Sequence, residues 1–121
     1  MKPAQFLRFV HTLTATVLFL LLSGPYAHSQ YIASVQFSGS PGNYTIAIAG
    51  GGFGKLTETL PFTGDTSNFG VTDRNTNTQY GYGNNSDHLT YKVWTDTAIT
   101  VSGYGGNPGD VTDIDVWNSV S

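Results

Sequence analysis

The sequence predicts an all-β protein, an antiparallel β-sandwich of about seven strands that is preceded by a cleaved signal peptide. Three observations carry this prediction. Apolar and polar residues alternate in short runs after residue 30, as they do in strands with one buried face. Gly, Pro, Asn and Asp separate these runs at close intervals, as turns do in a sandwich. No long run repeats its apolar residues with a helical period of about 3.6, so no helix is expected after the leader.

The first part of the chain has the features of a secretory signal peptide. Lys2 and Arg8 form a basic start, residues 9–22 carry no charge, and the small residues Ala27 and Ser29 fit a cleavage site. A membrane-spanning helix needs about 20 apolar residues, whereas this run is shorter and interrupted by polar residues. We therefore expect residues 1–29 to be removed on export and residues 30–121 to form one domain, secreted or at the cell surface, without membrane insertion.

The mature chain is acidic and contains no cysteine. It keeps three basic and all eight acidic residues, a net charge of −5. Nucleic-acid binding needs a basic surface that neutralises phosphates, so nucleic acid and anionic membranes are not expected partners. A small exported domain often relies on disulfides. This one must instead be stabilised by packing, by hydrogen bonds or by assembly with other copies.

The expected strands follow one another between recognisable turns. The Pro-Gly segments at residues 38–43 and 105–110 predict tight turns, and the glycines of residues 49–54 predict a bend out of a strand. Residues 63–86, rich in Asn, Thr and Gly, predict either strands with long loops or a mobile flap. Alternation places Leu89, Tyr91 and Val93 on one buried face. The expected strands are residues 31–38, 43–50, 68–73, 78–83, 88–94, 98–104 and 110–118.

Residues 60–64 read Leu-Pro-Phe-Thr-Gly and match the LPxTG pattern that sortases recognise when they tether proteins to a cell wall. That motif acts near a C-terminus, before an apolar span and a basic tail, and here predicted strands follow it. We interpret the match as structural. Pro61 and Gly64 turn the chain, and Leu60 and Phe62 contact the core.

Three stretches, in order, resemble the IPT/TIG domain of secreted bacterial type. Residues 40–54 are similar to the opening of that family, in which a Pro/Gly turn leads into a strand that ends in a G-x-GFG bend. Residues 93–101 resemble its W-S-D-T-x-I-x-V stretch, and residues 109–118 resemble its closing G-D-x-V-x-V-x-V-x-N strand. The resemblance implies an immunoglobulin-like sandwich and no catalytic activity. The long, glycine-rich loop at residues 102–110 departs from the family pattern.

The mature chain is poor in residues that support catalysis. His88 is its one histidine, no G-x-S-x-G motif is present, and His88 beside Asp87 is interpreted as a histidine at a strand edge. We therefore expect neither an enzyme nor a cofactor. Metal binding is not expected either, and Asp110, Asp113 and Asp115 are only weak calcium candidates, because like charges at this spacing are more typical of a solvated face.

Tyrosines in loops are the candidate binding residues. Tyr80, Tyr82 and Tyr104 lie among Gly and Asn, a composition typical of adaptable recognition surfaces, whereas Tyr91 and Trp94 are expected in the core. These features predict a non-catalytic module that binds an extracellular carbohydrate or protein through loops and sheet edges. The alternative is a self-assembling subunit of an extracellular filament or matrix, because low charge and open sheet edges favour strand pairing between copies. In that case the strand that starts the mature domain pairs either within its own sheet or with another copy.

Overall fold

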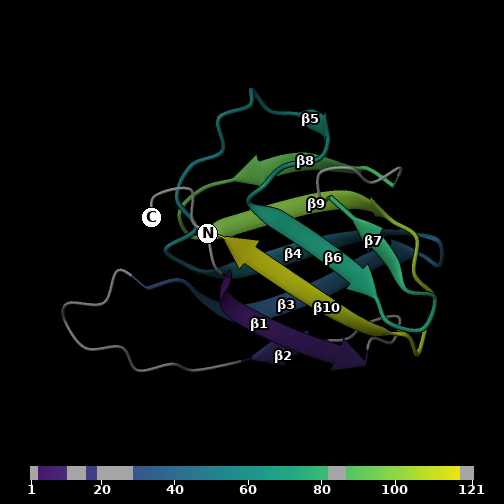
Figure 1. Ribbon diagram of the computed structural model, residues 1–121. Helices are drawn as coiled ribbons and strands as arrows, with labels where there is room; N and C mark the ends of the chain where they lie inside the picture. The colour runs from purple at the N-terminus through teal and green to yellow at the C-terminus, as the bar shows by residue number, and fades with distance from the viewer. Residues whose placement is uncertain (1–2, 11–15, 19–28, 82–86, 118–121) are drawn as a thin grey trace.

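The computed structural model describes residues 3–10 and 16–18 by their backbone, and residues 29–81 and 87–117 in full (Figure 1). The described residues form ten strands and no helix, so they include no helical segment that could span a membrane. The strands are β1 (Pro3–Val10), β2 (Thr16–Leu18), β3 (Tyr31–Ser40), β4 (Asn43–Gly51), β5 (Phe62–Gly64), β6 (Phe69–Asp73), β7 (Thr78–Tyr80), β8 (Leu89–Trp94), β9 (Ala98–Tyr104) and β10 (Val111–Trp117).

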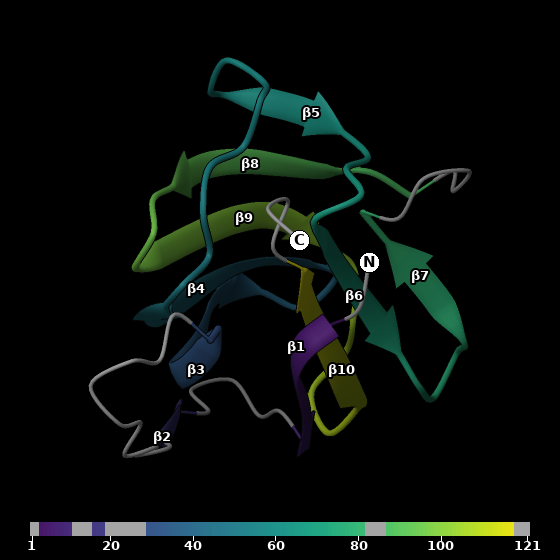
Figure 2. The same cartoon turned by 60° about the vertical axis from the view of Figure 1, so that its left-hand side comes forward.

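Two antiparallel sheets face one another (Figure 1, Figure 2). The first has the strand order β1-β10-β6-β7, and the second has the order β2-β3-β4-β9-β8-β5. The predicted all-β fold with antiparallel sheets is confirmed, and each strand expected after residue 30 is present. The strands β1, β2 and β5 add to the expected set, and the first two of these lie in the segment interpreted as a leader.

The apolar sides of both sheets form one core between them. Its centre is aromatic: the ring of Phe69 stands edge-on to Tyr91 and to Trp94, with centroids 6.0 and 6.2 Å apart. Such pairs add to the stabilisation that comes from removing apolar area from water. The buried core residues are Ile32, Val35, Phe37, Tyr44, Ile46, Ile48, Phe53, Phe69, Val71, Leu89, Tyr91, Trp94, Ile99, Val101, Tyr104, Ile114 and Val116.

A β-bulge in β8 changes which of its residues face the core. Leu89 and Tyr91 are buried as predicted, but Val93 is 39% exposed and Trp94 takes the inward position. The register between β8 and β9 shifts between Tyr91 and Val93, and one extra residue reverses the alternation beyond that point. The prediction for Val93 is therefore wrong, and the prediction that Trp94 belongs to the core is confirmed.

The stretch that matches the sortase pattern belongs to the folded domain. Phe62–Gly64 is the edge strand β5, which pairs with β8. Leu60 and Phe62 pack against the core, and the ring of Phe62 stacks on Tyr91 with centroids 5.9 Å apart. The expected contact of these two residues with the core is confirmed.

The strands β1 and β2 cover one edge of each sheet. β1 pairs antiparallel with β10, from Pro3↔Trp117 to Val10↔Val111, and β2 pairs with β3. On its other side β3 pairs with β4 of the same chain, which places the first strand of the expected mature domain in its own sheet. Removal of residues 1–29 stays a prediction.

Candidate functional site

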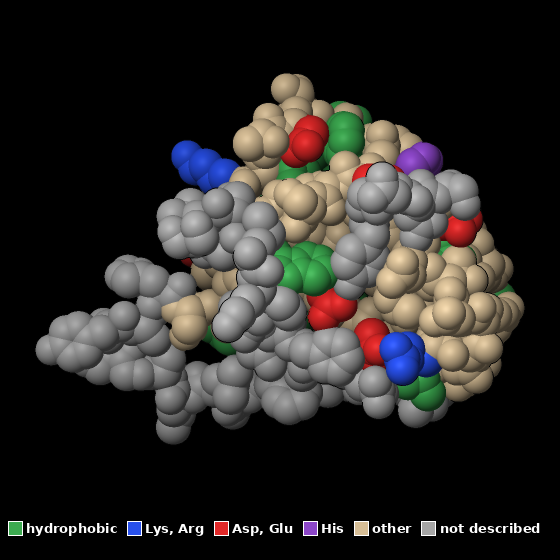
Figure 3. Space-filling view, in the orientation of Figure 1, with side chains coloured by type: hydrophobic (Ala, Val, Ile, Leu, Met, Phe, Trp, Pro, Cys, Tyr) green, Lys and Arg blue, Asp and Glu red, His purple; other side chains and the backbone are tan. Residues whose placement is uncertain are grey.

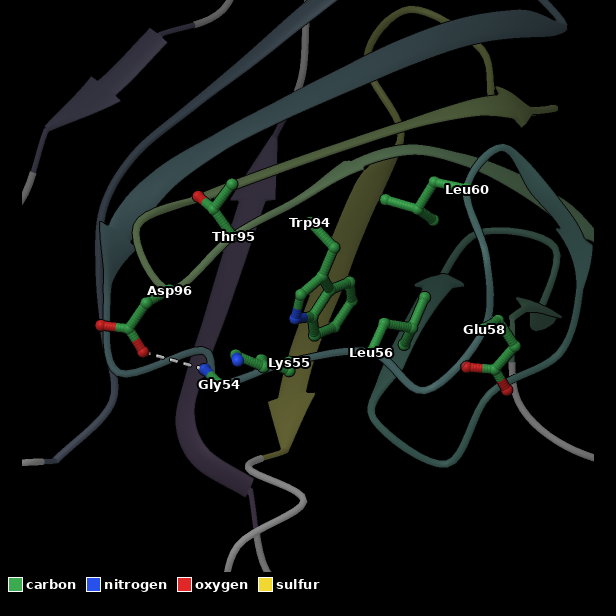
Figure 4. Close-up of a pocket in the computed structure, with 8 residues that line it drawn as sticks. All are labelled: Gly54, Lys55, Leu56, Glu58, Leu60, Trp94, Thr95 and Asp96. Atoms are coloured by element: carbon green, nitrogen blue, oxygen red, sulfur yellow. Dashed lines mark hydrogen bonds between the residues drawn. The ribbon is translucent and has the colours of Figure 1, made fainter.

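A cleft of about 640 Å³ opens where the loop after β4 passes the turn that follows β8 (Figure 4). Its volume is within the range of small-molecule sites in proteins. Two leucines and the indole of Trp94 supply its apolar surface, and charged side chains of both signs surround them. The lining residues are Gly54, Lys55, Leu56, Glu58, Leu60, Trp94, Thr95 and Asp96.

A glycine bend begins the loop that forms one side of the cleft. Gly52 and Gly54 have φ angles of 74° and 73°, which glycine adopts without strain. A Cβ atom at Gly52 would lie 2.9 Å from the carbonyl oxygen of Ser29, so the backbones approach too closely for a larger residue. Phe53, between the two glycines, is buried in the core. The bend therefore directs the chain out of β4 while one ring anchors it.

Hydrogen bonds connect this bend to the turn that forms the opposite side. The backbone N–H of Phe53 donates to the carbonyl of Asp96 at 3.1 Å, and the N–H of Gly54 donates to Oδ1 of Asp96 at 3.0 Å. The hydroxyl of Thr95 accepts from the N–H groups of Thr97 and Ala98 at 3.2 and 3.0 Å. Such side-chain bonds hold a tight turn. Both sides of the cleft are thus fixed relative to each other.

The indole of Trp94 lies deep in the cleft and carries an unpaired donor. The residue is 8% exposed, and its Nε1 has no hydrogen-bond partner in the described structure. In Figure 4 the nitrogen-bearing edge of the ring points toward Gly54 and Lys55, with Leu56 and Leu60 beyond its other edge. An unsatisfied buried donor destabilises a fold by about 1–3 kcal/mol. The nitrogen has less than 1 Å² of exposed surface, so a ligand acceptor would remove that penalty only if the lining shifts to admit it.

Charged groups surround the apolar floor of the cleft. Lys55 and Asp96 are exposed, and Glu58 is half-buried and accepts a hydrogen bond from the hydroxyl of Thr57 at 3.0 Å. The cleft therefore offers an ammonium donor and carboxylate acceptors beside an apolar surface. On the face drawn in Figure 3 the described basic side chains form no continuous patch. The exclusion of nucleic acid stays a prediction.

The three candidate tyrosines do not form a surface in the described residues. Tyr104 is wholly buried, so the expectation that it lies exposed in a loop is wrong. It is the last residue of β9 and faces the core, where its hydroxyl lies 2.8 Å from Oγ1 of Thr112. Tyr80 ends β7, is half-buried and stands edge-on to Tyr104 with centroids 5.1 Å apart. Tyr82 lies outside the described residues. A binding role for Tyr80 stays a prediction.

Burial changes the acidity of these side chains. Burial raises the pKa of the Tyr104 hydroxyl above its usual value, although the hydrogen bond with Thr112 opposes the increase. The pKa of Tyr80 is also raised, first by burial and then by the carboxylates of Asp87 and Asp73, while a hydrogen bond to the backbone of Gly105 acts in the opposite direction. Both phenols are therefore neutral at ordinary pH.

The aspartates considered for calcium have other partners. Asp113 is buried, and its Oδ2 lies 3.4 Å from Nε of Arg74. Asp110 accepts a hydrogen bond from the backbone N–H of Asn107 at 2.9 Å, which closes the turn before β10. The described residues hold no group of three carboxylates or histidines placed around a common metal position. In this structure Asp110, Asp113 and Asp115 therefore do not converge on an ion.

His88 makes its contact with an aspartate that the sequence analysis did not consider. Its Nδ1 lies 2.9 Å from Oδ1 of Asp65, and its side chain is 47% exposed. The partner comes from the segment after β5, because β5 pairs with β8 and brings both residues to the same sheet edge. Neither residue lines the cleft. The interpretation of His88 as an edge histidine agrees with this exposure, and the absence of catalysis stays a prediction.

Comparison of the chain with models of protein families, with curated proteins and with solved structures finds no match. Of the residues that line the cleft, the sequence analysis singled out Leu60 and Trp94, and only as core residues. It missed Lys55, Glu58 and Asp96. The sequence does show a glycine bend after β4 and a Thr-Asp-Thr turn after β8 as separate local features, but their contact depends on how the strands are paired.

Proposed function

We propose that this chain is a secreted, non-catalytic binding module with an immunoglobulin-like sandwich of the IPT/TIG kind, and that it binds carbohydrate in the Trp94 cleft. The observation that carries the proposal is the cleft itself. It combines an apolar floor, an unpaired indole N–H and charged groups of both signs. A concave site of this size favours a small or extended ligand over the broad, flat contact that is typical of a protein partner.

The chemistry of the lining matches that of a sugar. A pyranose has an apolar face that packs on aromatic and aliphatic side chains, and hydroxyls that both donate and accept. In the cleft, Leu56 and Trp94 supply the apolar contact, Glu58 and Asp96 accept from hydroxyls, and Lys55 donates to them. The indole N–H of Trp94 is buried and unpaired beneath this surface, so a ligand acceptor reaches it only if the lining shifts. The bend that carries the family resemblance would then serve to shape a binding site.

The test uses the purified secreted protein on a glycan array, followed by calorimetry with each sugar that it retains. Lys55→Met removes the ammonium from the cleft, and Lys92→Met removes an exposed ammonium from β8, outside the cleft. A charged hydrogen bond contributes about 1.5–3 kcal/mol, so we expect Lys55→Met to weaken binding about tenfold or more. Lys92→Met should bind like the unaltered protein.

Tryptophan fluorescence locates the ligand independently. The chain has two tryptophans, and a Trp117→Phe background leaves Trp94 as the reporter. Ligand in the cleft should change the emission of Trp94 with the same dissociation constant that calorimetry gives. Equal effects of Lys55→Met and Lys92→Met, together with unchanged Trp94 emission, would show that the binding site lies elsewhere. Retention of no sugar at all would exclude the carbohydrate proposal.

A further inference from the structure

Two long strands depend on the predicted leader to cover one of their sides. β10 pairs with β6 on one side and with β1 on the other, and β3 lies between β4 and β2. If residues 1–29 are removed on export, β10 and β3 become sheet edges. The edges at the other ends of the sheets, β7 and β5, are short strands of three residues each. Export therefore exposes the two long edges of the sandwich.

The backbone of β10 shows which groups cleavage would leave unpaired. The N–H of Val111 donates to Asn75 and the N–H of Trp117 donates to the carbonyl of Asn68, so these residues direct their polar groups to the β6 side. Successive residues of a strand alternate in this direction. Every second residue between them, namely Thr112, Ile114 and Val116, therefore directs its N–H and C=O groups toward β1. Unpaired backbone groups on a long edge are a template for another strand.

Charge decides which strand of a second copy fits this edge. Antiparallel pairing of β10 with β10 of a second copy about its centre sets Asp113 opposite Asp115, and like charges directly opposite one another are destabilising. β3 contains no charged residue, and its ten residues are long enough for the seven residues of β10. Loss of β2 also makes β3 available. The partner that matches β10 in length and charge is thus the β3 edge.

We propose that removal of the leader allows β10 of one copy to pair antiparallel with β3 of a second copy. The contact joins two different surfaces, so an assembly of any length still presents one free β3 edge at one end and one free β10 edge at the other. A head-to-tail contact that does not close into a ring produces an open filament. In the uncleaved chain, β1 and β2 occupy both edges and prevent this pairing. The proposal is independent of the Trp94 cleft.

The first experiment compares the full chain, produced without export so that it keeps its leader, with the product secreted by the same host. Intact mass spectrometry establishes the N-terminus of each. Light scattering after size exclusion then gives the mass in solution over a concentration series. We expect the full chain to stay monomeric and the secreted product to lack residues 1–29 and to grow in mass with concentration. A secreted product that keeps residues 3–10, a monomer at all concentrations, or a dimer that does not grow would each overturn the proposal.

Cross-linking identifies the strands that meet. Because the chain has no cysteine, every cross-link reports only on introduced residues. Val111→Cys on the outer face of β10 is combined in turn with Ser34→Cys, Gln36→Cys or Ser38→Cys on β3. At least one pair should give a ladder of dimers, trimers and larger species on a non-reducing gel of the secreted product, and none in the full chain.

The control pair replaces the β3 cysteine by one on the neighbouring inner strand. Thr45 on β4 lies opposite Ser38 in the sheet, one strand farther from the edge. Val111→Cys with Thr45→Cys should give no ladder. The reduced form of every variant must match the circular dichroism spectrum of the unaltered protein, which shows that the fold is kept. A ladder with Thr45→Cys, or none with any β3 position in folded variants, would exclude the β10–β3 contact.

Discussion

Tyr91, Trp94 and Tyr104 lie in the core, and they differ in how their polar atoms are satisfied. The hydroxyl of Tyr104 has Thr112 as its partner at 2.8 Å. The hydroxyl of Tyr91 and the indole nitrogen of Trp94 have no partner in the described structure. A partner stabilises a buried polar group, and its absence destabilises the fold. Trp94 differs from Tyr91 because its indole lines the cleft, although its nitrogen is itself buried.

The hydroxyl of Tyr104 has a hydrogen-bond partner and that of Tyr91 has none, and removal of each hydroxyl tests this difference. Tyr104→Phe leaves the buried hydroxyl of Thr112 without its partner, so we expect a loss of about 1–2 kcal/mol in the free energy of unfolding. Tyr91→Phe removes an oxygen that has no partner and should be neutral or stabilising. The two variants delete the same atom from wholly buried rings, and urea unfolding measures both. Equal destabilisation would show that Tyr91 does have a partner in solution.

Seven of the ten described strands were predictable, because alternation and turn residues are local properties of the sequence. The Pro-Gly turn at residues 41–42 separates β3 from β4 as expected. The bulge in β8 was not predictable, because it depends on the register that β8 adopts beside β9. Tyr104 was misplaced for a related reason. Glycines flank Tyr104 in the sequence, but it is the last residue of β9 and its side chain faces the core. Its burial therefore follows from its position in the strand and not from the glycines beside it.

Because of the bulge, replacement of two valines on adjacent strands should change the free energy of unfolding by different amounts. Val93 is 39% exposed because the bulge turns it outward, whereas Val101 on β9 is wholly buried. Val101→Ala creates a cavity in the core and should lower the free energy of unfolding by about 2 kcal/mol. Val93→Ala should change it by less than about 0.5 kcal/mol. Urea unfolding of both variants is the measurement. A larger loss for Val93→Ala would place β8 in the unbulged register that simple alternation predicts.

The cleft could not be predicted from the sequence because it joins two loops that lie far apart in the chain. Gly54 and Asp96 are in contact only because β4 and β8 both flank β9 in the second sheet. The glycine bend and the Thr-Asp-Thr turn were recognisable as separate local features. The contact between them follows from the order of the strands, which a single sequence does not contain.

The arrangement of the whole molecule explains why one chain suggests both binding and assembly. The cleft lies at the end of the second sheet where the β4–β5 loop meets the β8–β9 turn. The edges that β10 and β3 would form lie beside β1 and β2. The two proposed contacts therefore use different parts of the sandwich, and a filament of such modules would present one cleft for each copy. The experiments can test each proposal without the other.

The stability of the whole molecule should fall in alkaline solution, because burial raises the pKa values of Tyr80, Tyr91 and Tyr104 above the usual value of about 10. As the pH rises above about 10, the unfolded chain loses these phenolic protons while the folded chain keeps them. Ionisation therefore favours unfolding, and the stabilisation present below this pH is lost as the pH approaches the folded values. Urea unfolding between pH 8 and pH 11 should show a plateau and then a decline. The decline should be shallower in Tyr91→Phe, which lacks one of the three phenols, and an equal slope in both proteins would exclude Tyr91 as a contributor.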